Sequence, residues 1–172
     1  MLAESAIPSE APVAPTFEWL VETYHPAVYR FLSRLCLGRR QEAEDLCQEA
    51  FLRAFRAFER LPPDAHHRAW IYRIAYNLFL NQRRRAATVE LPEELPARDI
   101  DHAGYDLARR VAEFVRTLPA KQRAALVLRH VEGRDYAEVA EILGCSEDSA
   151  RANLFQAVKK IRARFDEEYR ES

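Results

Sequence analysis

The sequence predicts an all-α protein made of two small helical domains joined by a flexible acidic linker, and three observations lead to this fold class. Apolar residues recur at helical spacing along most of the chain. No stretch alternates apolar and polar residues for long enough to propose a strand. Residues 88–106 lack helical periodicity and are rich in proline and acids, so they separate two helical parts. We expect a disordered leader over residues 1–15, a first domain over 16–87, the linker over 88–106, a helix-turn-helix domain over 107–166 and a tail over 167–172.

The net charge of −1 hides a segregation of charge along the chain. Residues 68–85 carry several arginines and no acid, and the stretch from Arg151 to Arg164 is also basic without an acid. The linker between these two stretches is rich in Glu and Asp. Such alternation suggests two surfaces that face nucleic acid, joined by an acidic strap.

Several other classes of protein are disfavoured. No apolar run approaches the ~20 residues of a membrane span, and the start of the chain lacks the pattern of a signal peptide, so we expect a cytoplasmic protein without direct membrane insertion. Cys36, Cys47 and Cys145 show no paired spacing and are expected to be buried thiols. His66 and His67 are adjacent on a loop and make a poor metal site. Because the sequence holds no Gly-rich phosphate loop and no nucleophile beside a base, we expect no enzyme, no metal and no cofactor.

Periodicity and helix-terminating residues predict six helices before the helix-turn-helix. The first begins near Thr16, and the second runs from Pro26 to Gly38. The other four run from about Gln41 to Arg60, from Arg68 to about Arg85, from Leu107 to Leu118, and from Pro119 to Gly133.

The helix from Gln41 to Arg60 has a polar stripe opposite its apolar side. Acids lead and bases follow along it, which suits the helix macrodipole, and Glu49 and Arg53 form a favourable i,i+4 pair. The stripe is either a solvated face or a docking surface for a protein partner, and the pattern alone leaves both open. Its residues, which we expect to face one way, are Glu42, Asp45, Glu49, Arg53, Arg56 and Arg60.

The helix from Arg68 to about Arg85 combines an apolar ridge with aromatic and polar residues. Trp70, Ile71, Ile74, Ala75 and Leu78 are expected in the core, with Tyr72, Tyr76 and Phe79 around the side. The polar stripe consists of Arg73, Asn77, Asn81 and Arg84. Rings interleaved with arginine and amide side chains suit single-stranded nucleic acid, because bases stack on rings and amides hydrogen-bond base edges. The alternative is a half-buried helix with aromatic core residues and a solubilising arginine end.

Residues 135–165 predict two helices around a tight turn. Asp135 caps the first helix, with Glu138 reaching back as in a capping box. Gly144 occupies the position where a left-handed residue is needed, and Ser146 caps the second helix.

The second of these helices has a basic face that carries an aromatic side chain. Arg151, Phe155, Lys159 and Arg162 share this face, opposite the residues expected to pack inward. The arrangement fits a helix that reads a DNA major groove. An ordinary helix pair with a solvated basic face is the alternative, but it gives no reason for an aromatic residue between Arg151 and Lys159.

Four motifs in order resemble those of bacterial sigma factors of the extracytoplasmic-function group. They are Asp45-Leu-Cys-Gln-Glu-Ala-Phe-Leu-Arg-Ala-Phe55, Arg68-Ala-Trp-Ile-Tyr-Arg-Ile-Ala-Tyr-Asn77, Leu118-Pro-Ala-Lys-Gln-Arg123, and Tyr136-Ala-Glu-Val-Ala-Glu-Ile-Leu-Gly144 followed by Ser146. The resemblance covers nearly everything from Phe17 to Phe165. It implies an all-helical subunit that binds RNA polymerase core, directs it to promoter DNA and has a cognate anti-sigma factor. It also implies a linker that threads toward the active-site cleft.

The resemblance, together with the polar stripes above, gives three sets of candidate site residues. The polymerase-core candidates are Asp45, Gln48, Glu49, Arg53 and Arg56. The minus-ten candidates, beside a loop over residues 61–67, are Arg73, Tyr76, Asn77, Asn81 and Arg84. The minus-thirty-five candidates are Ser146, Arg151, Ala152, Phe155, Gln156 and Lys159.

The chain departs from the family pattern at several of these positions. Asn81 stands where Asp is common, Ala150 where Val is usual, and Gln156 where the family has Arg. Ala152 and Asn153 replace a Ser-Arg pair. We therefore expect this chain to recognise a promoter sequence that is not inferred from those of better-known family members. Alternatives to a sigma factor are a stand-alone helix-turn-helix repressor or activator, for which no dimer helix is evident, and a non-DNA adaptor that mimics a sigma factor.

Overall fold

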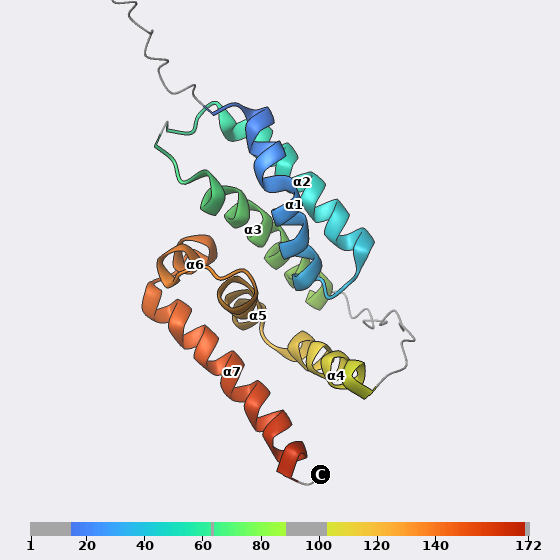
Figure 1. Ribbon diagram of the computed structural model, residues 1–172. Helices are drawn as coiled ribbons and strands as arrows, with labels where there is room; N and C mark the ends of the chain where they lie inside the picture. Colours follow the sequence, from blue (N-terminus) through green and yellow to red (C-terminus); the bar gives the residue numbers. More distant parts are fainter. Residues whose placement is uncertain (1–14, 63, 89–102, 171–172) are drawn as a thin grey trace, which may run out of the picture.

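Figure 1 shows the computed structural model, in which two helical modules lie against each other. The structure describes residues 15–62, 64–88 and 103–170. The first module contains α1 (Phe17–Leu35), α2 (Arg40–Phe58) and α3 (His67–Thr88). The second contains α4 (Ala103–Thr117), α5 (Ala120–Leu126), the π-helix η1 (Val127–Val131), α6 (Tyr136–Leu143) and α7 (Glu147–Arg170). No strand occurs in these described residues, which confirms the all-α prediction.

Much of the expected leader and of the expected linker falls outside these ranges. The structure does not describe residues 1–14 or 89–102, whereas residues 103–106, expected in the linker, belong to α4. None of the described helices is both long enough and apolar enough to cross a bilayer.

The two helices expected on either side of Pro26 are a single helix, so that prediction is wrong. The side chain of Thr16 caps α1 by accepting a hydrogen bond from the backbone N–H of Trp19 at 3.2 Å, and Pro26 lies inside the helix. A proline removes one backbone hydrogen bond there. Leu20 before it and Phe31 after it are both fully buried in one core, and this shared burial keeps the two halves aligned.

Three aromatic residues of α3 form the centre of the first module rather than its side. Tyr72, Tyr76 and Phe79 are fully buried, whereas Trp70 and Ile74, expected in the core, are only half-buried. The ring of Phe31 from α1 lies 5.1 Å from that of Tyr72. α3 packs against α1, α2 and α6, and these three rings lie in the core that these helices share.

The helix expected from Pro119 to Gly133 ends in a π-helical turn. The backbone N–H of Glu132 donates to the carbonyl of Val127 at 3.0 Å, and the N–H of Arg134 donates to that of Leu128 at 2.9 Å. Gly133 follows with φ of 68°, in the left-handed region. This wide turn sets the position of Glu132 relative to the first module.

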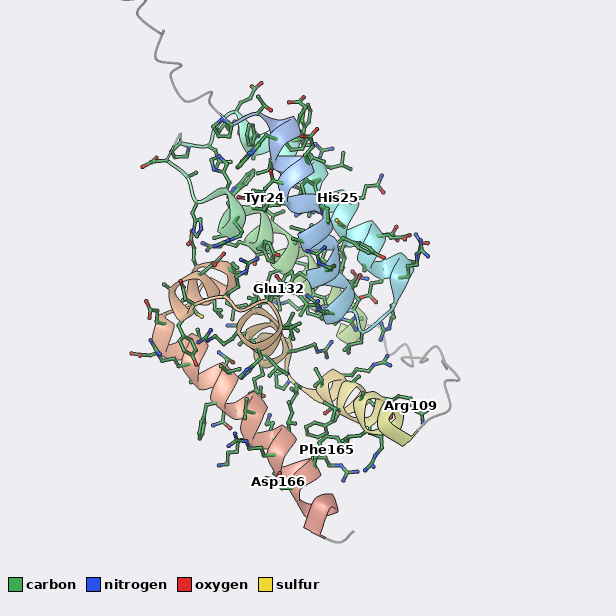
Figure 2. The ribbon with its side chains drawn as sticks, viewed as in Figure 1. Tyr24, His25, Arg109, Glu132, Phe165 and Asp166 are labelled. Atoms are coloured by element: carbon green, nitrogen blue, oxygen red, sulfur yellow. The ribbon has the colours of Figure 1, made fainter. Side chains whose placement is uncertain are left out.

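The outer helices of the second module are longer than expected. α4 begins at Ala103 rather than Leu107, and α7 runs to Arg170. The rings of Phe114 and Phe165 meet edge to face at 5.9 Å between these helices, and Figure 2 labels Phe165.

The helix-turn-helix is confirmed as α6, a turn and α7. The carboxylate of Asp135 accepts from the N–H of Glu138 at 2.8 Å, Gly144 adopts φ of 64°, and the hydroxyl of Ser146 accepts from the N–H of Ser149 at 3.2 Å. Only half of the expected capping box forms, because the side chain of Glu138 pairs with Arg68 of the first module.

The cysteines are free thiols. Cys36 and Cys47 are buried as expected, and Cys145 is half-buried. Burial raises the pKa of Cys36 to about 12, with the carboxylate of Glu42 adding to the effect. Burial likewise raises the pKa of Cys47 to about 11.

Candidate polymerase and nucleic-acid interfaces

The candidate polymerase-binding residues share an outer face of α2. Asp45, Gln48, Arg53 and Arg56 are exposed, and Glu49 is half-exposed. The amide nitrogen of Gln41 donates to Asp45 at 3.0 Å, and Nε of Arg53 donates to Glu49 at 2.7 Å. These local pairs hold the side chains in defined positions but contribute little to stability, since they are solvent-exposed. Asp45, Glu49 and Arg53 of this face are therefore paired within α2 itself.

Glu42 does not belong to that face, which corrects the expectation that the polar stripe faces one way. Its carboxylate accepts from Arg83 of α3 at 2.5 Å and from Arg39 at 3.1 Å, and its side chain is 11% exposed. Glu42 therefore ties α2 to α3, and the exposed stripe begins at Asp45.

Two apolar residues of α2 add to the outer face and were not among the sequence candidates. Leu52 is 46% exposed and Phe55 is 63% exposed. The ring of Phe55 meets that of Phe17 edge to face at 5.1 Å. The sequence held a signal for them, because both fall off the apolar side that packs inward. Exposed apolar residues among polar ones are typical of protein-docking surfaces.

Four of the five minus-ten candidates lie together on α3. Arg73, Asn77, Asn81 and Arg84 are exposed at helical spacing. Tyr76 is instead fully buried, and burial raises the pKa of its phenol, with Cys145 nearby adding to the effect. The ring of Tyr76 cannot stack on a base while the two modules pack as in this structure.

A cavity of about 420 Å³ adjoins this face, between the end of α2 and the start of α3. Residues of the first module line most of it, and Glu141 of α6 lines the remainder. Nδ1 of His66 lies 2.8 Å from a carboxylate oxygen of Glu141. The first-module residues of the lining are Ala57, Arg60, Leu61, Pro62, Ala65, His66 and Trp70.

All six minus-thirty-five candidates are exposed on the helix-turn-helix. They lie at the start and along the outer face of α7: Ser146, Arg151, Ala152, Phe155, Gln156 and Lys159. Ala150 and Leu154 on the opposite side are buried. Phe155 is 64% exposed, so its ring is available to contact a thymine methyl group or a sugar in a major groove.

Two side chains that were not among the candidates, Tyr136 and Glu147, contact Arg151 of this face. The guanidinium of Arg151 lies 4.1 Å from the ring centre of Tyr136, and that of Arg129 lies 5.1 Å from the same ring. A carboxylate oxygen of Glu147 also lies 3.3 Å from Nη2 of Arg151. The sequence gives no sign of this contact of Tyr136, because a cation–π contact across a turn leaves no periodic pattern.

Nothing in the described ranges resembles a metal centre. Within residues 15–62, 64–88 and 103–170, no three His, Cys, Asp or Glu side chains gather as a metal site would require. His67 instead packs its ring 5.6 Å from that of Trp19.

Comparison with known families identifies both modules. A model of sigma-70 region 2 matches residues 20–88, and a model of sigma-70 region 4 matches residues 108–161. An ECF RNA polymerase sigma factor, SigE of Mycolicibacterium smegmatis, is 34% identical over 158 residues, which span 86% of this chain and 61% of the relative. The ECF RNA polymerase sigma-E factor of Haemophilus influenzae is 30% identical over 84% of this chain and 85% of the relative.

Solved structures agree with this result over both modules. The sigma factor RpoE in complex with the anti-sigma factor NepR from Bartonella quintana matches with a TM-score of 0.68 and 25% identity, covering 86% of this chain and 94% of that one. CnrH in complex with the cytosolic domain of CnrY matches with a TM-score of 0.65 and 25% identity over 87% of each chain. With region 2 on the first module and region 4 on the second, the chain belongs to the extracytoplasmic-function group of the sigma-70 family.

Proposed function

We propose that the chain binds RNA polymerase core and directs it to promoters, with α7 reading the minus-thirty-five element as duplex and α3 taking the melted minus-ten strand. The observation that carries this proposal is the exposed face of α7, where Arg151, Phe155 and Lys159 lie on a helix-turn-helix scaffold with a buried opposite side. A basic helix face that carries an exposed aromatic residue suits a major groove.

The two modules divide the work of recognition. Phosphate contacts from Arg151 and Lys159 would position the second module, while Phe155 and Gln156 contact base edges. Unstacking each base step costs a few kcal/mol, and each stacked base returns about 1–3 kcal/mol. The free energy gained when the first module captures bases therefore offsets the cost of opening the promoter only when several contacts act together. This explains why two modules that each bind DNA weakly act while bound to polymerase.

Docking to core polymerase is proposed for the outer face of α2. Asp45, Gln48, Glu49, Arg53 and Arg56 supply the polar contacts, with Leu52 and Phe55 as an apolar centre. Apolar residues inside a polar rim are the usual arrangement of a stable interface.

The partners and location follow from the same proposal. RNA polymerase core and promoter DNA are the direct partners, and an anti-sigma factor is proposed because two similar sigma-type structures were solved with such a protein or a cytosolic domain bound. We place the chain in the cytoplasm, where polymerase works. It is proposed to act without chemistry of its own, since polymerase makes the phosphodiester bonds.

A binding experiment in two arms tests the proposal. Fluorescence anisotropy of a labelled promoter library is measured with the chain alone and with the chain plus purified core polymerase. The proposal predicts weak binding by the chain alone and selection of defined sequences by the complex. Tight binding of the chain alone to a palindromic duplex would instead indicate a stand-alone helix-turn-helix regulator.

A further inference from the structure

The outer face of α7 carries side chains that differ in how far the folded chain already engages them. In a helix-turn-helix, residues near the start of the second helix contact base edges, and α7 starts at Glu147. A side chain that is already held by its own module is less available to a base than one that is not. The identity of the bases that α7 reads therefore follows from which polar groups of this face are engaged.

The guanidinium of Arg151 is held against α6. It lies 4.1 Å from the ring centre of Tyr136, the first residue of α6, and its Nη2 donates to a carboxylate oxygen of Glu147 at 3.3 Å. In this motif the first helix crosses the DNA backbone. A guanidinium held beside that helix is placed to meet a phosphate, which every sequence offers, rather than a base edge.

Two further polar groups near the start of α7 do not supply a donor for guanine. Nδ2 of Asn153 donates to the backbone carbonyl of Ser149 at 2.8 Å, so its amide lies back along the helix. Asp148 is exposed one turn before Ala152, but its carboxylate only accepts hydrogen bonds. Guanine presents two acceptors in the major groove, N7 and O6, and neither can bond to a carboxylate.

Three exposed side chains remain at the centre of the face: Ala152, Phe155 and Gln156. Their spacing of i, i+3 and i+4 places them together on the helix surface. The amide of Gln156 makes no hydrogen bond within residues 15–62, 64–88 and 103–170. One helical turn rises about 5.4 Å and base pairs lie about 3.4 Å apart, so the three side chains reach about two neighbouring base pairs.

The chemistry of these three side chains matches adenine and thymine. Adenine presents an acceptor at N7 and a donor at N6, which pair with the amide nitrogen and oxygen of a glutamine. Against guanine the same amide would set its oxygen beside an acceptor. The methyl group of Ala152 and the ring of Phe155 offer apolar surface of the kind that contacts the C5-methyl group of thymine.

From this arrangement we infer that α7 reads neighbouring A·T pairs, with Gln156 on an adenine and with Ala152 and Phe155 on thymine methyl groups. The inference rests on the proposed function and deepens it, because it names the bases read at the same minus-thirty-five site. Arg151 contributes affinity through a phosphate and no preference between bases.

Selection from random duplexes of promoter length tests the adenine contact. The full chain bound to core polymerase is used, as the natural sequence and as Gln156→Arg, whose guanidinium matches the two acceptors of guanine. We expect the variant to change one enriched position from adenine to guanine and to leave the other positions unchanged. The matched control is Ala163→Arg, which adds the same charge at an exposed site two turns farther along α7 and should keep the adenine.

Base analogues in the enriched duplex test the methyl contacts on the unaltered chain. Deoxyuridine in place of thymine removes only the methyl group, and we expect affinity to fall by about fourfold at the thymine beside the adenine of Gln156. In Phe155→Ala the same replacement should have a smaller effect, because the ring that meets the methyl group is gone.

Three outcomes would overturn the inference. They are enrichment of guanine by the natural sequence at the position that Gln156→Arg alters, the same bases enriched by Gln156→Arg as by the natural sequence, and unchanged affinity after deoxyuridine replacement. If circular dichroism shows that Gln156→Arg has lost helix, deoxyuridine and 7-deazaadenine replacements with the natural sequence decide, since the latter removes the N7 acceptor. Failure of the proposed function is distinct, because the complex would then enrich no sequence at all.

Discussion

The carboxylate of Glu138 and the guanidinium of Arg68 form a two-point hydrogen-bonded pair between positions 70 residues apart in the sequence. Its two N–O distances are 2.5 and 3.0 Å. Glu138 begins as an ordinary residue in the first turn of α6, where Asp135 caps its N–H. Its side chain, however, serves the contact between the two modules. The backbone of Glu138 thus takes part in the cap of α6, while its side chain holds α6 against α3.

Loss of the α6 cap should weaken the second module. Replacing Asp135 with Ala removes the acceptor for the N–H of Glu138, and we expect the free energy of unfolding to fall by ~1 kcal/mol. Asp135→Asn is the matched control, because its amide oxygen can still cap. Urea unfolding followed by circular dichroism measures both variants. Equal losses in the two variants would show that the charge of Asp135, and not its capping bond, stabilises the helix.

Alkaline pH should destabilise the fold through buried acidic groups. Burial raises the pKa of Cys36 to about 12, and burial with the hydrogen bond to Glu132 raises the pKa of Tyr72 to about 12. In the unfolded chain these groups lose their protons at lower pH, near 9 and 10. Their contribution to stability is therefore complete below about pH 9 and is lost as pH rises toward 12.

Urea unfolding at a series of pH values from 7 to 11 measures whether stability falls or rises with pH. The free energy of unfolding should fall above pH 9, and Cys36→Ala should make the fall shallower. An increase in stability over that range would contradict the burial of these groups.

Reversal of charge on α2 should release the chain from core polymerase. Asp45→Lys with Glu49→Lys reverses two side chains of the outer face and places a lysine beside Arg53. We expect affinity for core to fall by roughly tenfold to a hundredfold, as when charged contacts at an interface become repulsive. Co-purification with tagged core measures the effect. Glu44→Lys with Glu113→Lys is the control of equal charge change, and a similar loss in the control would reject this docking face.

Removal of two side chains from α7 should abolish promoter selection and leave core binding unchanged. Arg151→Ala with Phe155→Ala deletes the anchored guanidinium and the exposed ring. A side chain that reads a base edge contributes ~1–3 kcal/mol of discrimination against the wrong base. Competition between promoter and random duplex, measured on the chain–core complex, gives the selectivity. Full selectivity in this variant would show that another surface reads the duplex.

The sequence was sufficient for those features that depend on neighbouring residues. Asp135, Gly144 and Ser146 are capping and turn signals, and they occupy the predicted positions in α6 and α7. The Glu49–Arg53 pair forms as its i,i+4 spacing predicts. The exposed positions of the minus-thirty-five candidates on α7 follow from the helical periodicity of its apolar and polar residues.

Features that depend on distant residues could not be read in this way. Pro26 continues a helix because Leu20 and Phe31 share one core, and Tyr76 is buried because residues far along the chain cover it. Periodicity describes one helix at a time and cannot show which face a second module covers. Whether Asn77, Asn81 and their neighbours meet DNA stays a prediction.

Run-off transcription with purified core polymerase on a promoter library tests the central claim most directly. The chain is predicted to make core initiate RNA at defined start sites that share a sequence element, with Arg151→Ala, Phe155→Ala losing these starts. If core with this chain begins RNA at no defined site on any template, the chain does not select promoters and the account is wrong.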